Sequence, residues 1–175
     1  MSISPDLQGL NFWRYQRQIS PGFQEFIEAV SFEHYLQTQS LITHEDAAKL
    51  LPSKIDLTDD DYILGLFDLT GELMRFAITA IATSGSPPGS EQVKTADEKT
   101  ILVDLQQLRT RFEALATISQ GSTGLGKEVE KKLEVMKTCV EKVEAAVYGK
   151  TIRGREGHNG WMPDILDHGV RVETY

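Results

Sequence analysis

Residues 58–83 read TDDDYILGLFDLTGELMRFAITAIAT. The stretch is apolar on nearly every side of a helical wheel, and its middle is interrupted by Asp68, Glu72 and Arg75. A helix that is apolar all round belongs in the interior of a bundle rather than on its surface. We therefore expect the rest of the chain to pack around this one helix.

The start of this helix carries its own signal. Thr58 followed by Asp61 resembles a capping box, in which a side-chain hydroxyl accepts from a free backbone N–H. The run Asp59–Asp61 suits the positive end of the helix dipole. We interpret that run as a solvated acidic first turn.

The other periodic segments also predict helices, and no segment predicts a strand. Ser20-Pro21 either starts a helix as N-cap and first-turn proline or kinks a longer one. Polar segments rich in glycine, serine or proline predict loops at 84–97 and 121–126. The predicted helices cover residues 11–19, 20–39, 43–51, 98–119 and 127–150. Their expected core positions are Phe23, Phe26, Ile27, Val30 and Leu36; then Ile101, Leu105, Leu108, Phe112 and Leu115; then Val129, Leu133, Met136, Val140, Val143 and Val147.

Composition limits the class of protein. The chain of 175 residues is 40% hydrophobic and 25% charged, which is typical of one globular domain, 1–175, with a core at 11–154 and a tail at 155–175. Its single cysteine, Cys139, excludes an internal disulfide and favours a reducing compartment. No secretory signal is visible. The acidic residues of the long apolar helix argue against a membrane span, and a formal net charge of −8 argues against nucleic-acid binding by this chain alone.

Two predicted helices each present a pair of carboxylates on one face. Glu25 and Glu28 are three residues apart, and Asp68 and Glu72 are four apart, so each pair shares a face of its helix. Packed helices lie about 8–10 Å apart, which allows the two pairs to converge. Four ionised carboxylates would not cluster without a cation or protons, because two unit charges 4 Å apart repel by about 4 kcal/mol at an effective dielectric of about 20.

Oxygen ligands without cysteine or histidine favour Mg²⁺, Mn²⁺ or Ca²⁺ over zinc. A di-iron centre is the rival, but it requires Glu-x-x-His on two helices and neither pair supplies the histidine. The alternative without a metal is a set of unrelated carboxylates in a wet groove, each paired with its own Lys or Arg. Arg75, one turn beyond Glu72, either contacts a phosphate or forms a salt bridge with a carboxylate, and the salt bridge is favoured.

Four long segments resemble one known family. FQEFIEAVSFEHYLQT (23–38), SLIT (40–43), DYILGLFDLTGELMR (61–75) and KKLEVMKTCVEKVEAAVYGKTIRG (131–154) are similar to the translin superfamily. The acidic residues of QEFIEA and DLTGELMR resemble its translin-associated factor X (TRAX) branch rather than translin itself. The resemblance implies an all-α, antiparallel helical bundle of the translin type that lacks the first helices of the family.

The resemblance also implies a function. It predicts a subunit that assembles with translin into a hetero-octamer, a Mg²⁺-dependent (or Mn²⁺-dependent) endoribonuclease for short single-stranded RNA in cytoplasm and nucleus. The expected substrates are passenger strands of small RNAs or fragments from tRNA processing. The catalytic and metal-binding carboxylates of the family map onto Glu25, Glu28, Asp68 and Glu72. The alternative is a non-catalytic structural subunit that binds translin and scaffolds RNA binding.

Overall fold

The computed structural model describes residues 9–52, 55–85, 87–88, 100–119 and 125–155. Over these ranges the chain forms helices and no strand, so the prediction of an all-α fold is confirmed. The helices are α1 (Leu10–Thr38), α2 (His44–Lys49), α3 (Asp59–Thr83), α4 (Ile101–Ser119) and α5 (Leu125–Arg155). Most of the predicted tail lies outside the described residues.

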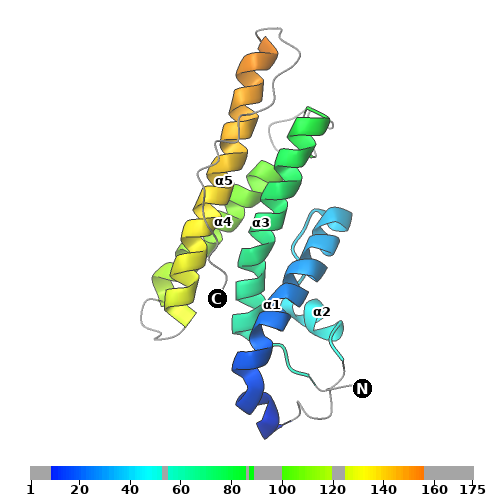
Figure 1. The fold of residues 1–175 in the computed structure, drawn as a ribbon, viewed down its shortest axis with the longest axis vertical. Coiled ribbons are helices and arrows are strands. Elements are labelled where there is room, and N and C mark those ends of the chain that lie inside the picture. Colours follow the sequence, from blue (N-terminus) through cyan, green and yellow to red (C-terminus); the bar gives the residue numbers. More distant parts are fainter. Residues whose placement is uncertain (1–8, 53–54, 86, 89–99, 120–124, 156–175) are drawn as a thin grey trace.

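Helix α3 lies between α1 and α5, and α4 packs against α5 (Figure 1). The helix predicted at 58–83 is thus the central one. Its buried residues lie between Asp61 and Ala77, whereas the last turns, from Ile78 onward, are only partly covered. The apolar character of the whole stretch therefore overstates burial at its C-terminal end.

The contacts between helices fix their directions. Ser20 contacts Asp61 and Phe32 contacts Phe76, so α1 and α3 run in the same direction. Helix α5 runs the same way as α3, while α4 runs antiparallel to both (Figure 1). The chain returns from the end of α1 to the start of α3 through α2 and residues 50–58, which permits the parallel pair.

The start of α3 is a buried hydrogen-bond network. Thr58 is the N-cap, and its hydroxyl accepts from the Asp61 N–H at 3.1 Å and donates to Asp61 Oδ2 at 2.7 Å. Ser20 Oγ on α1 donates to the other Asp61 oxygen and accepts from Gln24 Nε2 at 3.1 Å. Asp61 is 1% exposed, so the prediction of a solvated acidic turn is wrong for this residue. The N-cap role of Thr58 is confirmed, and Asp61 bonds back to its hydroxyl.

One glycine sets how closely α1 and α3 approach. A Cβ added to Gly65 would lie 2.6 Å from Ile27 Cβ and 2.9 Å from the Gln24 carbonyl oxygen. Real Cβ atoms do not approach other atoms so closely, so a side chain here would push the two helices apart. The close crossing lies one turn before Asp68 and at the level of Glu25 and Glu28.

Several predicted boundaries need correction. Pro21 lies inside α1, so the alternative of one longer helix is the one that forms and Ser20-Pro21 does not start a helix. A proline in a helix interior removes one backbone hydrogen bond at a cost of about 3 kcal/mol. Helix α5 begins at Leu125, so the loop predicted at 121–126 is wrong for its last two residues. Residues 121–124 and most of the loop predicted at 84–97 lie outside the described residues.

The core follows the predicted stripes with one error. On α1 the buried position is Tyr35, while Leu36 is 49% exposed, because α1 turns its Ile27–Ser31–Tyr35 face to α3. The predicted stripes of α4 and α5 are confirmed, with Leu115 and Val147 at their edges. Cys139 is buried, as expected for a packing residue.

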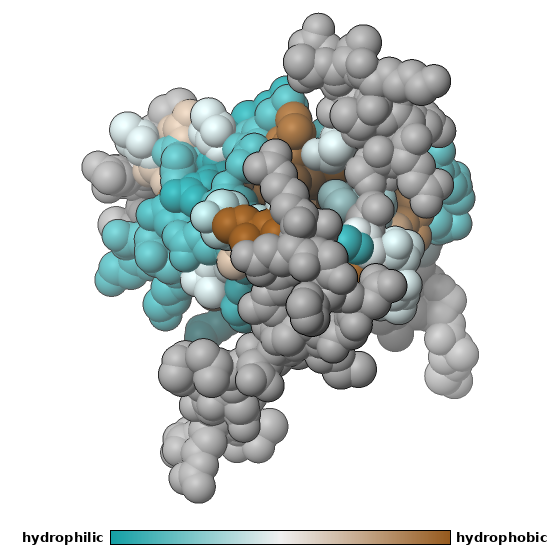
Figure 2. Space-filling model, turned by 90° about the horizontal axis from the view of Figure 1, so that it is seen from above, coloured by the Kyte–Doolittle hydropathy of each residue, from teal (hydrophilic) through white to brown (hydrophobic). Residues whose placement is uncertain are grey.

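One end of the molecule shows a mainly polar described surface. Seen along the helices, hydrophilic side chains dominate the described surface, and apolar residues show only in small areas (Figure 2). None of the described helices is both long and apolar enough to cross a membrane.

Candidate functional site

The close crossing at Gly65 brings carboxylates of α1 and α3 together. Glu28 is half-buried on α1, and Asp68 and Glu72 are half-buried on α3. Glu25 lies one turn before Glu28 and is exposed. We refer to these four residues as the carboxylate set.

The electrostatics of Glu28 relate α1 to one carboxylate of α3. Burial raises the pKa of Glu28, and the negative charges of Asp68 and Glu25 raise it further. The positive charges of Arg75 and Lys132 act in the opposite direction and lower it. A carboxyl group on α1 is therefore influenced by Asp68 and Arg75 of α3 and by Lys132 of α5, while convergence of all four carboxylates stays a prediction.

Arg75 joins the two helices. Its Nε donates to Glu72 Oε2 at 3.1 Å, and Nη2 contacts the other oxygen of Glu72. Arg75 Nη2 also lies 3.9 Å from Glu28 Oε1. The salt bridge that was favoured over a phosphate contact is thus formed, although 60% of the arginine side chain is exposed and can meet a ligand.

Lys132 on α5 makes the second ion pair of the site. Its Nζ donates to Asp68 Oδ1 at 2.6 Å and to Oδ2 at 2.7 Å. The exposed fractions are 21% for the lysine side chain and 35% for the aspartate, so the pair is partly shielded from water. Asp68 is therefore held by a side chain of α5 as well as by its own helix.

The donor chemistry of the carboxylate set suits a hard divalent cation, since Mg²⁺ and Mn²⁺ prefer oxygen ligands. The geometry is less complete. Among the described residues, no three His, Cys, Asp or Glu side chains converge closely enough to hold a metal ion as they stand. Asp68 and Glu72 instead direct their oxygens at Lys132 and Arg75. A cation at Asp68 or Glu72 would therefore compete with Lys132 or Arg75.

Two features of this region were not predicted from the sequence, namely the place of Lys132 in the site and the burial of Asp61. Lys132 follows Val129 by three positions and precedes Met136 by four, so it lies at the edge of the apolar stripe of α5. A lysine in such a position needs an acidic partner, and that signal could have identified it. Asp61 offered no comparable signal, because acidic first turns are normally solvated.

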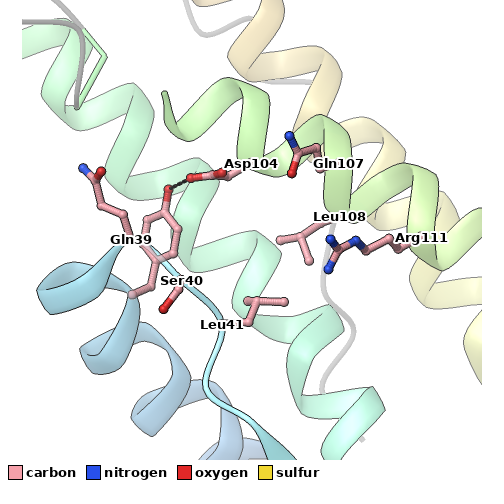
Figure 3. A pocket seen from close by; sticks show the side chains of 8 residues that line it. Gln39, Ser40, Leu41, Asp104, Gln107, Leu108 and Arg111 are labelled. Carbon is pink, nitrogen blue, oxygen red and sulfur yellow. Dashed lines mark hydrogen bonds between the residues drawn. The ribbon is translucent and has the colours of Figure 1, made fainter. Parts of the chain in front are cut away.

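A polar cavity of about 240 Å³ lies elsewhere, between the end of α1 and α4 (Figure 3). Gln39, Ser40 and Leu41 line it on one side, and residues of α4 including Arg111 line the other. The Tyr35 hydroxyl donates to Asp104 Oδ2 at 2.7 Å, and burial together with this contact raises the tyrosine pKa. None of the four carboxylates lines this cavity, so it is distinct from the carboxylate set.

Comparison with known proteins places the chain in a family. Residues 1–154 match the translin family. Translin-associated protein X of Mus musculus is 32% identical over 190 aligned residues, which cover 95% of this chain and 60% of the mouse protein. The Schizosaccharomyces pombe homolog of that protein is 31% identical over 152 residues, covering 87% of this chain and 59% of the relative. Translin of Gallus gallus is 26% identical over 149 residues, covering 82% and 58%.

The chain thus spans about 60% of the length of the curated relatives it matches. The family match extends over both helices that carry the carboxylate set and over the lysine of α5 that pairs with it. The chain belongs to the translin family, and within it the chain is more similar to these translin-associated X proteins than to this translin.

Proposed function

We propose that this chain is the catalytic subunit of a hetero-oligomeric endoribonuclease that contains translin, requires Mg²⁺ or Mn²⁺ and cleaves short single-stranded RNA. Three of its relatives are named for an association with translin, and we extend that association to this chain. A net charge of −8 leaves most RNA contacts to a partner, because phosphate binding depends on Lys and Arg. We propose that the assembly is a hetero-octamer with translin, as the family resemblance implies.

One observation carries the proposal. Gly65 allows α1 and α3 to cross so closely that the charge of Asp68 on α3 raises the pKa of Glu28 on α1, 40 residues earlier in the sequence. A carboxyl group whose pKa is raised by burial and by a neighbouring carboxylate carries a cost in its ionised form, and such perturbed carboxyl groups cluster at active sites.

A bound Mg²⁺ would supply charge neutralisation at the phosphodiester and a water molecule of lowered pKa. The chain's own residues would do the rest. Glu28, whose pKa is raised, is suited to accept a proton from water, with Glu72 as the second candidate. Asp68, Glu25 and Glu72 would hold the cation. The exposed guanidinium of Arg75 would bind a phosphate oxygen of the RNA.

The alternative function is a non-catalytic subunit that binds translin and scaffolds RNA. The observation that favours it is the present pairing of the carboxylates, because Asp68 is satisfied by Lys132 and Glu72 by Arg75. Such pairing is what a carboxylate with only a structural role would show. The biological substrates, passenger-strand or tRNA fragments in cytoplasm and nucleus, belong to the first proposal.

The test is co-expression of the chain with translin, followed by cleavage of a fluorescent single-stranded RNA across a titration of Mg²⁺ and of Mn²⁺. We expect saturable, cation-dependent cleavage that chelation abolishes and that translin alone does not give. A co-purifying complex that binds the RNA but does not cleave it with either cation would reject the nuclease and support the scaffold. Failure of the two chains to co-purify would reject the proposed partner.

A further inference from the structure

Lys132 is held where a cation bound to Asp68 would lie. Its ammonium is 2.6 and 2.7 Å from the two oxygens of Asp68, so it faces the carboxylate symmetrically. It reaches this place from α5, a helix that carries none of the carboxylate set. The lysine stem lies at the edge of the apolar stripe, and only 21% of the side chain is exposed.

The same ammonium also acts on the second helix of the site. Its charge lowers the pKa of Glu28 on α1, while it is bonded to Asp68 on α3. One positive charge therefore serves carboxylates of both helices.

A lysine and a divalent cation cannot share Asp68 at close range. Two unit positive charges 4 Å apart already repel by about 4 kcal/mol at an effective dielectric of about 20, and a divalent ion doubles that figure. The lysine ammonium sits on a flexible four-carbon stem, so it can leave without movement of α5. Aspartate oxygens freed in this way would be available to the metal.

We propose that Lys132 is a built-in counter-ion that holds Asp68 between the helices in the metal-free protein and is displaced when a divalent cation binds. The inference rests on the proposed function, because it concerns the same site. It makes Lys132 a positioning residue, acting through Asp68, and it explains how carboxylates that are paired in this structure can still serve a cation. It also predicts that the lysine lowers the affinity of the site for metal.

The first experiment measures Mn²⁺ binding by electron paramagnetic resonance in the complex with translin, for the wild-type chain and K132M. Methionine keeps the apolar stem of lysine and removes the competing charge. We expect K132M to bind Mn²⁺ about fivefold more tightly, because the metal no longer has to break a partly exposed ion pair before it binds Asp68. The matched control is K137M, since Lys137 lies on the same helix and pairs with Glu134, away from the carboxylate set; it should leave Mn²⁺ affinity unchanged.

The second experiment uses the wild-type complex and does not depend on folding of a variant. Lysine labelling by an amine reagent is quantified by mass spectrometry with and without Mg²⁺. Displacement predicts that labelling of Lys132 rises severalfold on addition of Mg²⁺, whereas labelling of Lys137 does not change. Equal or lower labelling of Lys132 in Mg²⁺ would overturn the proposal, as would unchanged or weaker Mn²⁺ binding by K132M.

These measurements can reject the counter-ion role of Lys132 without rejecting the metal site. If the wild-type complex binds no Mn²⁺, both the metal site and the counter-ion are rejected. If the wild-type complex binds Mn²⁺ and cleaves RNA, but neither K132M nor the labelling responds, the nuclease stands and only the counter-ion is rejected.

Discussion

Asp61 and Asp68 lie two turns apart on α3 and are satisfied in different ways. Asp61 is buried and accepts hydrogen bonds from two neutral hydroxyls. One belongs to Thr58, three residues earlier in the chain, and the other to Ser20 on α1. Asp68 is partly exposed and pairs with the ammonium of Lys132 from another helix. A carboxylate held by neutral donors stabilises the fold, whereas one held by a movable cation next to other carboxylates can exchange that cation. The same substitution, Asp to Asn, should therefore lower RNA cleavage at Asp68 and lower the stability of the fold at Asp61.

The largest expected effect is on catalysis at Asp68. In the complex with translin, D68N should lower single-stranded RNA cleavage by at least about 100-fold, the scale of losing one essential electrostatic group. Its midpoint of thermal unfolding should change little, because a partly exposed ion pair contributes about 1 kcal/mol or less. RNA binding, measured by fluorescence anisotropy, should stay near the wild-type level. Cleavage at the wild-type rate would remove Asp68 from the catalytic residues.

Asp61 should show the reverse pattern. D61N keeps the size of the side chain but loses the charge that accepts from two hydroxyls, and the free energy of unfolding should fall by about 1–3 kcal/mol. Urea denaturation of the purified protein measures this loss. The folded fraction should cleave RNA at the wild-type rate per complex. A stable D61N protein without cleavage would contradict the structural role assigned to Asp61.

The helix crossing gives the third prediction. G65A should destabilise the fold by about 1–3 kcal/mol, because the added Cβ overlaps Ile27 and the Gln24 backbone. It should also weaken Mn²⁺ binding, since it separates the helices that carry the two carboxylate pairs. The control is G22A on α1, where an added Cβ meets no atom within 4 Å. Equal stability of the two variants would show that the crossing is not tight.

The smallest effect concerns Glu28 and pH. Its pKa is higher in the folded chain than in the unfolded chain, so ionisation of Glu28 removes stability as pH rises through the interval between those two values. E28Q cannot ionise and should be more stable than wild type at pH 7, in buffer with a chelator. The difference in unfolding midpoint should shrink towards pH 4.

The control for that measurement is E33Q, which changes an exposed glutamate of the same helix. It should give no pH-dependent difference from wild type. If E28Q is less stable than wild type at pH 7, then the attraction of Arg75 and Lys132 outweighs burial and the neighbouring carboxylates, and the direction assigned to the pKa of Glu28 is wrong.

The local sequence pattern determined the helices, almost all core positions and the pairing of the carboxylates on each helix. Helical periodicity predicted the helices and almost all core positions, since burial of one face imposes a repeat that local spacing reveals. The i, i+3 and i, i+4 spacing placed Glu25 with Glu28 and Asp68 with Glu72, because it fixes which side chains share a helix face. Similarity to the translin family extended over the segments that carry them.

Only the tertiary structure decided what these side chains meet. Whether Asp61 is solvated or buried depends on where α1 crosses α3, and that crossing depends on a contact between Gly65 and Ile27. The partner of Asp68 is a lysine 64 residues away, and no local spacing relates the two. Contacts between helices depend on how their whole surfaces pack, so the packing of the helices decides which basic side chain a carboxylate such as Asp68 meets.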